Sequence, residues 1–320
     1  MNKIVVVGST NIDLMAKVHH LPSRGETVCD AEFSQAIGGK GMNQAIAAAR
    51  LGGDVIFVTA LGNDHYASLL KKHLQNEKII TDYVIDDSEQ PTGMALIYVS
   101  HEGENCIAVA PGANNKLQPT LLDTFKKALD RADIVIMQAE IPYQTICATA
   151  SYAKSHGKKV ILNLAPAKEA DPELLSNVDV LVVNEIEGGI VAGLPYSNDN
   201  MDQIMIRLKH TGVKNIVVTV GSKGAYLITP FGCSHIEPYK VDVVDTVAAG
   251  DTFCGALAVQ FSGDYITEEN MRYANAASAI AVTRHGATTS IPTAEEVDRF
   301  LLQCECISSP QPNILQYEKI

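Results

Sequence analysis

The sequence predicts an α/β fold, in which a doubly wound, mostly parallel sheet is flanked by helices and carries a small antiparallel β lid. Most of the chain alternates short apolar, β-branched runs with stretches of helical periodicity, which is typical of βαβ units. Four other segments mix polar and apolar residues between turn residues, as half-exposed antiparallel strands do. The chain is 46% apolar but contains no Trp, so we expect an aliphatic core of the kind that buried parallel strands form.

Each element follows from its local pattern. Strands of the large sheet are expected at the apolar runs, residues 4–7, 55–59, 134–137, 159–163, 178–183, 215–220, 225–228 and near 241–244. Lid strands are expected at residues 14–18, 27–33, 94–99 and 106–110, with a turn at 101–105. Helical periodicity predicts helices at residues 43–51, 66–75, 119–128, 143–156, 202–210, 251–261, 268–284 and 294–304.

No Pro- or Ser-rich linker and no internal repeat divides the chain. We therefore expect one α/β domain over residues 1–306, with lid strands inserted at about 14–33 and 94–110. Residues 307–320 show little periodicity and are expected to form a flexible C-terminal tail.

Composition narrows the possible partners and location. A net charge of −12 argues against nucleic acid as a main partner. The seven cysteines follow no disulfide framework, which favours reduced thiols. Neither a signal peptide nor an apolar run of about 20 residues is visible, so we expect a cytoplasmic protein with no membrane span.

The run VDVVDTVAAGDTFCGA at residues 241–256 is the most informative segment. It predicts a strand, a turn of small residues (Ala248, Ala249 and Gly250) and a helix start. Backbone N–H groups at such a helix start favour an anion. Asp251 follows directly, and a carboxylate beside an anion cradle suits phosphoryl transfer to a hydroxyl. An ordinary acidic residue in a first helical turn is the alternative for this segment alone.

Polar residues also follow several predicted strands, and ligands of doubly wound sheets bind at that edge. Asn11 and Asp13 are two residues apart, so in extended chain they face one side. The other residues of this kind are Glu140, Asn184, Glu187, Asp245 and the run GSKG at 221–224. Any one of them alone fits a cap or turn equally well.

Four runs together resemble the signatures of the ribokinase-like (PfkB) carbohydrate kinases. They are GSTNID at 8–13, GGKGMN at 38–43, NEIE at 184–187 and DTVAAGDTF at 245–253, in the family's order. The resemblance covers residues 1–303 and implies transfer of phosphate from ATP to a sugar, with D-ribose as the expected substrate. The Walker A pattern is absent, as it is in the family. Within the class, deoxyribose, a nucleoside or a ketohexose are the alternatives.

The resemblance also implies residue roles. Asp251 is the expected base, and Ala248, Ala249 and Gly250 form the expected anion hole. The expected sugar-binding residues are Asn11, Asp13, Gly38, Gly39, Lys40, Asn43, Glu140 and Asp251. The expected ATP-binding residues are Asn184, Thr219, Val220, Gly221, Ser222, Lys223, Gly224, Gly250, Asp251 and Asn275. For Lys40, a solvated lysine at a helix start is an equal alternative.

The resemblance also implies two bound cations and a homodimer. Glu187 is the candidate for Mg²⁺, and its alternative is an exposed glutamate at a helix start. A K⁺ site is implied at Asp245, Val247, Ala281, Arg284, Gly286 and Ser290. The lid is expected to pair two copies of the chain. Many members of the family have Gly at the position of Ala248, but those that act on D-ribose commonly have Ala, which favours that substrate. Met42 replaces the usual Ala and is expected to pack inward, with a narrower sugar pocket as the alternative.

Two functions outside the class of sugar kinases are also compatible with the sequence. One is a non-catalytic sugar sensor on a kinase fold, which the retention of Asp251 and Glu187 disfavours. The other is a nicotinamide dehydrogenase, which the absence of G-x-G-x-x-G after the first strand disfavours.

Overall fold

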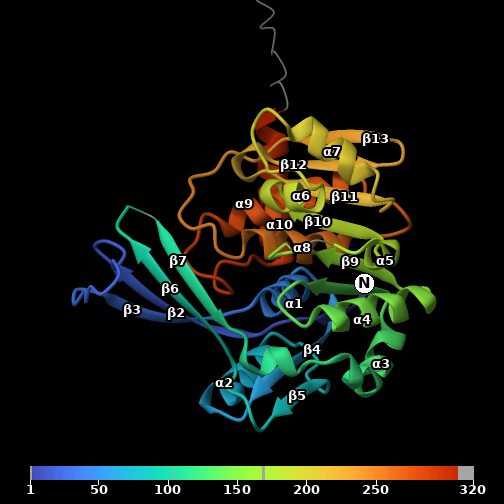
Figure 1. The fold of residues 1–320 in the computed structure, drawn as a ribbon. Helices are drawn as coiled ribbons and strands as arrows, with labels where there is room; N and C mark the ends of the chain where they lie inside the picture. Colours follow the sequence, from blue (N-terminus) through green and yellow to red (C-terminus); the bar gives the residue numbers. More distant parts are fainter. Residues whose placement is uncertain (1, 103, 168–169, 309–320) are drawn as a thin grey trace, which may run out of the picture.

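The computed structural model describes residues 2–308 except 103, 168 and 169, so nearly all of the expected tail at 307–320 lies outside the described residues (Figure 1). Its large sheet has nine strands in the order β13-β12-β11-β10-β9-β8-β1-β4-β5. The strands are β1 (Lys3–Val7), β4 (Asp54–Gly62), β5 (Val84–Asp87), β8 (Ile134–Gln138), β9 (Lys159–Asn163), β10 (Val180–Asn184), β11 (Asn215–Thr219), β12 (Ala225–Thr229) and β13 (Gly232–Ile236). All pairs are parallel except β11–β12 and β12–β13.

The lid is a second, four-stranded sheet that projects from the body of the molecule (Figure 1). Its strands, in spatial order, are β3 (Glu32–Gly38), β2 (Asn11–Val18), β6 (Gly93–Ser100) and β7 (Asn105–Ala110). The two outer pairs are antiparallel, and the central pair β2–β6 is parallel. The predicted fold class, a doubly wound sheet with a small β lid, is confirmed.

Helices cover both faces of the large sheet, and each face has its own apolar core. One core contains residues of α1 (Lys40–Arg50), α2 (His65–Asn76), α8 (Ala249–Gln260), α9 (Glu268–Ala281) and α10 (Ala294–Ser308). The other contains residues of α3 (Leu122–Arg131), α4 (Tyr143–Ser155), α5 (Pro172–Ser176) and α7 (Met201–Lys209). The remaining elements are α6 (Glu185–Val191) and the 3₁₀ turns η1 (Gly112–Lys116), η2 (Pro119–Leu121) and η3 (Gly221–Lys223).

Several predicted elements need correction. The lid strand expected at 27–33 lies at Glu32–Gly38, because pairing with β2 brings Gly38 opposite Asn11. The strand expected near 241–244 is irregular chain, and the amides of Val244 and Asp245 both donate to the carbonyl of Val282. The helix expected at 268–284 ends at Ala281. The strands β5 and β13 were not predicted because neither is an apolar run, and the helices α5 and α6 because each spans less than two turns.

Candidate active site

The glycine pair before α1 lets two chain segments approach closely. Gly39 is the N-cap of α1 with a φ of 92°, a conformation that favours glycine. A Cβ on Gly38 would collide with the carboxylate of Asp13 on β2. Asp13 therefore lies directly over Gly38, and both predicted sugar-binding motifs meet at the base of the lid.

Asp251 lies in the first turn of α8, and its side chain is held by residues of α1. Its Oδ2 accepts a hydrogen bond of 2.9 Å from Asn43 Nδ2, and its Oδ1 accepts one of 2.9 Å from Gln44 Nε2. The residue is 6% exposed. Two amide donors thus fix the orientation of the carboxylate, which a positioned general base requires.

A buried acceptor close by is left without a partner. Asn43 is buried, and its Oδ1 has no hydrogen-bond partner among the described residues. A buried acceptor in this state is costly unless a ligand donates to it. A hydroxyl group would satisfy Asn43 Oδ1 at the place where Asn43 Nδ2 holds Asp251, so this part of the site fits a sugar.

Glu140 and Asn11 complete the predicted sugar side. Glu140 Oε2 accepts hydrogen bonds from Ser9 Oγ at 2.6 Å and from the Lys40 amide at 3.0 Å. Asn11 is buried, and its Oδ1 accepts from Asn114 Nδ2 at 2.9 Å. The side-chain amide nitrogen of Asn11 is therefore the group that remains for a ligand.

The cluster is strongly acidic, and its charges perturb one another. Burial raises the pKa of Asp13 from 3.8 to about 6, and the carboxylates of Glu140 and Asp251 add to this effect. The negative charge of Asp251 raises the pKa of the Lys40 ammonium, with further contributions from Glu140 and Glu187. Lys40 is therefore held protonated among three carboxylates and is not an isolated surface lysine.

The start of α8 has free backbone donors. Ala248 is its N-cap, in the left-handed region with φ 58° and ψ 7°. The Ala249 amide donates to the Thr246 carbonyl at 3.3 Å, whereas those of Ala248, Gly250 and Asp251 donate to no described group. A Cβ on Gly250 would meet nothing within 4 Å. Open space beside free N–H groups at a helix start fits a phosphate.

The predicted nucleotide residues come from neighbouring strand ends. Asn184 at the end of β10 is in register with Thr219 at the end of β11, and η3 follows. Asn275 on α9 donates to the carbonyls of Ile236 and Glu237, at 3.5 and 3.2 Å. The side chain of Asn275 thus holds the end of β13, which is a structural role beside the expected contact with ATP.

Glu187 also has a structural role. Its Oε2 accepts from the Asn184 amide at 2.9 Å, and Asn184 Oδ1 accepts from the Glu187 amide at 2.8 Å, which makes a capping box at the start of α6. Burial raises the pKa of Glu187. Within the described part of the chain, no three His, Cys, Asp or Glu side chains converge as a metal cluster. A single carboxylate fits Mg²⁺, because this ion usually retains several waters.

Of the predicted K⁺ residues, Ala281 is the last residue of α9, and the others lie on two loops that Asp245 joins. Asp245 Oδ1 accepts from the Val247 amide at 3.0 Å, and Oδ2 accepts from the Gly286 amide at 2.9 Å. Ser290 is buried, and its Oγ donates to the Ala287 carbonyl at 2.8 Å. The structure thus brings together loops 245–247 and 284–290, whose carbonyl oxygens are the donor type that K⁺ prefers. Arg284 uses its guanidinium for Glu296 at 2.6 Å.

Four polar residues at the site were missed in the sequence. Gln44 donates to Asp251 and to Asn163 Oδ1, and it accepts from Gln138 Nε2 at 2.8 Å. Ser9 joins Glu140 to the Gly41 amide. Gln138 and Asn163 end the adjacent strands β8 and β9. The strand-end argument that selected Glu140 could also have selected these two residues.

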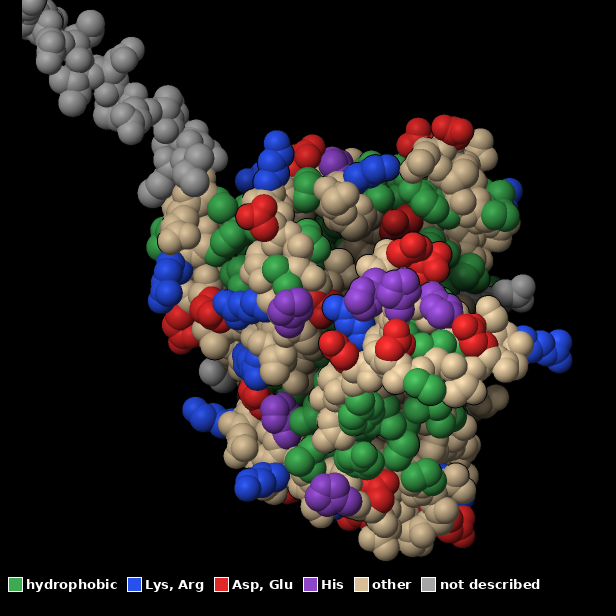
Figure 2. All heavy atoms as spheres, turned by 90° about the vertical axis from the view of Figure 1, so that its left-hand side faces the viewer, with side chains coloured by type: hydrophobic (Ala, Val, Ile, Leu, Met, Phe, Trp, Pro, Cys, Tyr) green, Lys and Arg blue, Asp and Glu red, His purple; other side chains and the backbone are tan. Residues whose placement is uncertain are grey.

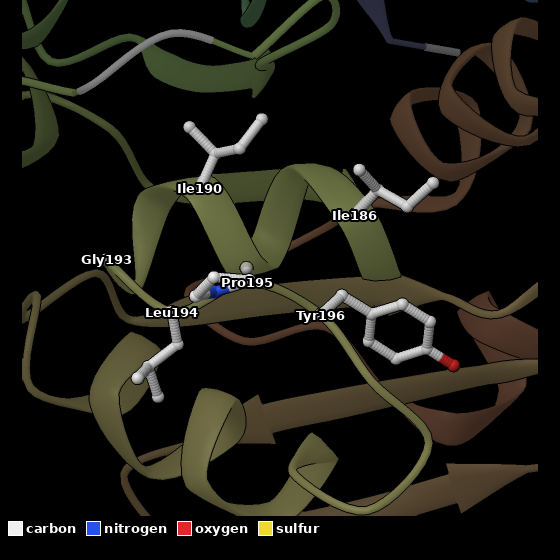
Figure 3. Close-up of a pocket in the computed structure, with 7 residues that line it drawn as sticks. Ile186, Ile190, Gly193, Leu194, Pro195 and Tyr196 are labelled. Carbon is white, nitrogen blue, oxygen red and sulfur yellow. The ribbon is translucent and has the colours of Figure 1, made fainter.

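An apolar pocket of about 580 Å³ lies elsewhere, against α6 (Figure 3). Ile186 and Ile190 point off the same side of that helix (Figure 3). Tyr196, at the pocket's edge, donates to Asn198 Oδ1 at 3.1 Å, and Lys223 Nζ donates to the same oxygen at 3.3 Å. Asn198 therefore connects Tyr196, which lines the pocket, to Lys223 of the predicted nucleotide loop.

Several known carbohydrate kinases are similar to this chain. Residues 1–294 match the pfkB family carbohydrate kinases. A ribokinase of Staphylococcus aureus (strain COL) is 39% identical over 302 residues, which is 93% of this chain and 99% of that protein. A deoxyribokinase of Salmonella typhi is 34% identical over 302 residues, with 93% and 98% covered. The structure of Arabidopsis thaliana ribokinase complexed with ribose and ATP gives a TM-score of 0.86 at 33% identity, with 94% and 98% covered.

The family match and the ribokinase relatives show that the chain is a phosphotransferase that acts on a sugar hydroxyl. No helix among the described residues is long and apolar enough to cross a membrane. With its match over residues 1–294, the chain belongs to the pfkB family of carbohydrate kinases.

Proposed function

We propose that this chain transfers the terminal phosphoryl group of ATP to the primary hydroxyl of D-ribose. One observation carries the proposal: Asn43 and Gln44 fix the carboxylate of Asp251 beside the free amides of Gly250 and Asp251. The relatives from S. aureus and A. thaliana, a ribokinase and a ribokinase complexed with ribose and ATP, support the choice of sugar and donor.

Each residue then has a chemical task. Asn11, Asp13, Asn43 and Glu140 bind sugar hydroxyls, and Asp251 takes the proton of the attacking hydroxyl. The amides at the start of α8 hold the transferring phosphoryl group, and the Lys40 ammonium offsets its charge. The ATP side is formed by Asn184, Asn275 and residues 219–224.

Two cations are part of the proposal. Mg²⁺ neutralises phosphate oxygens when bound, and Glu187 would hold it directly or through water. K⁺ would bind to carbonyl oxygens of the loops that Asp245 joins. Because Val247 immediately precedes the N-cap of α8, a cation there would help to order the anion hole.

Turnover with a panel of sugars tests the proposal. D-ribose should give a higher kcat/KM than 2-deoxyribose, a ketohexose or a nucleoside, and 2-deoxyribose is the second candidate because of the S. typhi relative. Asp251→Asn should lower kcat by about 10²–10⁴-fold, the usual contribution of one general base. The matched control is Asp123→Asn, which removes an exposed carboxylate paired only with Lys126. A variant Asp251→Asn with more than a tenth of wild-type turnover would exclude the base, and no turnover of any sugar by the wild type would favour a sensor.

The lid is proposed to pair two copies of the chain. On the face of the lid sheet opposite Asp13, the exposed apolar side chains are Phe33 at 68%, Leu96 at 43% and Tyr98 at 42%, whereas Ile107 and Val109 lie on the same face as Asp13. Hydrophobic side chains gather over the face on which the lid lies (Figure 2). Patches of this kind usually mark an interface, and the edge strands β3 and β7 are open to pairing.

Sedimentation tests the dimer directly. The wild type should sediment as a dimer at micromolar concentration, and Leu96→Lys should shift it toward monomer. Lys72→Glu on α2 is a control for a change of surface charge away from the lid. A wild-type monomer with full sugar kinase activity would contradict this part of the proposal.

A further inference from the structure

Arg50 makes four hydrogen bonds that the proposed chemistry does not use. It is the last residue of α1. Its Nη1 donates to the carbonyls of Thr288 and Ile291, at 2.7 and 2.8 Å. Its Nε and Nη2 donate to the two carboxylate oxygens of Glu77, at 2.9 and 2.6 Å. One guanidinium therefore joins the end of α1, the residue after α2 and the loop before α10.

This arrangement is mostly shielded from water. The side chains of Arg50 and Glu77 are 21% and 16% exposed. The hydrogen bonds from Arg50 lower the pKa of Glu77, so the pair stays ionised. Two parallel bonds between a guanidinium and a carboxylate are geometrically specific, and a lysine ammonium cannot reproduce them.

The loop to which Arg50 donates, residues 286–291, carries two of the proposed K⁺ ligands, Gly286 and Ser290. Thr288 and Ile291 enclose Ser290 in the sequence, and Gly286 lies two residues before Thr288. Asp245 holds an earlier residue of this loop, since it accepts from the Gly286 amide at 2.9 Å. Asp245 also accepts from Val247, the residue before the N-cap of α8. Two residues therefore fix the loop: Arg50 binds Thr288 and Ile291, and Asp245 connects Gly286 to the residue before the anion hole.

The same helix reaches the chemistry at its other end. Asn43 and Gln44, in the first two turns of α1, hold the carboxylate of Asp251. The 11 residues of α1 span about 16 Å. A single rigid element therefore contacts the proposed base near its N-terminus and the proposed cation loop at its C-terminus.

We propose that Arg50, oriented by Glu77, is a positioning residue that sets the 286–291 loop in the geometry needed for binding a monovalent cation. Its guanidinium binds the carbonyl oxygens of Thr288 and Ile291, and the carbonyls of Arg284, Gly286 and Ser290 are the ones that the ion would use. This inference rests on the K⁺ site of the proposed function and extends it to two residues that contact neither sugar nor nucleotide.

The test compares Arg50→Lys and Glu77→Gln with the wild type by two readouts. The first is the rise in melting temperature that KCl gives over tetramethylammonium chloride at equal ionic strength, because an ion that binds only the folded state stabilises it. The second is the K⁺ concentration for half-maximal sugar kinase activity. We expect both variants to raise that concentration at least about fivefold and to lose most of the K⁺-dependent melting shift. At saturating K⁺, their KM values for ATP and sugar should stay within about twofold of the wild type.

A control separates positioning from general stability. Lys154→Met removes an ion pair of 2.6 Å with the buried Asp179, far from the loop in sequence. It should lower the melting temperature and leave the K⁺ dependence unchanged. Because Glu77→Gln keeps the size and an acceptor oxygen, it tests the inference even if Arg50→Lys folds poorly.

The K⁺ site and the role of Arg50 are separately testable. If neither the melting temperature nor the activity of the wild type responds to K⁺, the K⁺ site and the role of Arg50 are both wrong. If the wild type responds and both variants respond at the same K⁺ concentrations, the role of Arg50 alone is wrong.

Discussion

Sugar affinity should depend on pH through Asp13. Burial and two neighbouring carboxylates raise its pKa to about 6, so about one-tenth of Asp13 is ionised at pH 5 and about nine-tenths at pH 7. An ionised carboxylate accepts hydrogen bonds from sugar hydroxyls through both oxygens, and the protonated form loses part of that capacity. The affinity for D-ribose should therefore fall about tenfold between pH 7.5 and pH 5.

The stability of the ligand-free protein should change in the opposite sense. A group whose pKa is higher in the folded state stabilises the fold while protonated, and this stability is lost as the pH rises from 3.8 towards about 6. Each pKa unit corresponds to about 1.4 kcal/mol, so ionised Asp13 lowers the free energy of unfolding above pH 7 by at most about 3 kcal/mol. Asp13→Asn should thus be more stable than the wild type at pH 8, although it binds sugar less tightly.

Calorimetric titration of D-ribose without ATP is the appropriate assay, because the phosphates of ATP would titrate in the same range. Asp13→Asn is the matched control, and its weaker affinity should vary little between pH 5 and 8. A wild-type affinity that stays flat over this range would refute the assigned pKa. A wild-type pH dependence that survives in Asp13→Asn would show that another group is responsible.

Three further outcomes follow from the site. Lys40→Met should lower kcat by at least about tenfold, with a smaller effect on the KM for sugar, because the Lys40 charge lies among Asp251, Glu140 and Glu187. Steady-state kinetics checks this, and an unchanged kcat would show that Lys40 takes no part in the chemistry. Ala248→Val should lose most of its kinase activity because a β-branched residue is strained at φ 58°, whereas the activity of Ala248→Gly should stay within a few fold of the wild type. Equal activities of the two variants would show that this turn does not shape the anion hole. Glu187→Gln keeps the capping box but loses its charge, so the Mg²⁺ concentration for half-maximal activity should rise about tenfold; an unchanged Mg²⁺ titration would exclude it as a ligand.

Much of this architecture could be predicted because its signals are local. The strands at the centre of the large sheet are uninterrupted apolar runs, and their helices carry a regular apolar face. Asn11 and Asp13 could be assigned to one side of a strand from their spacing alone, and both lie on β2. The small residues before Asp251 indicated a tight turn at a helix start, and α8 begins there.

Other features depend on contacts that no local pattern reports. The apolar run at 241–244 looks like a strand, but none of the described residues pairs with it as a strand, and the carbonyl of Val282 fixes its end. The lid strand β3 is polar and exposed along most of its length, so only its pairing with β2 defines its bounds. These segments take their conformation from tertiary contacts and not from their own hydrophobic pattern.

The contrast between the two ends of α1 shows where the sequence becomes uninformative. At its N-terminal end the glycines and the run KGMN indicate a ligand site, because a close chain approach needs particular residues. At its C-terminal end Arg50 is an ordinary basic residue in a last helical turn, which the helix dipole alone would explain. Its partners lie 27, 238 and 241 positions away in the sequence. The role of Arg50 is therefore defined by the fold, and a substitution there tests whether a residue remote from the sugar controls the response to K⁺.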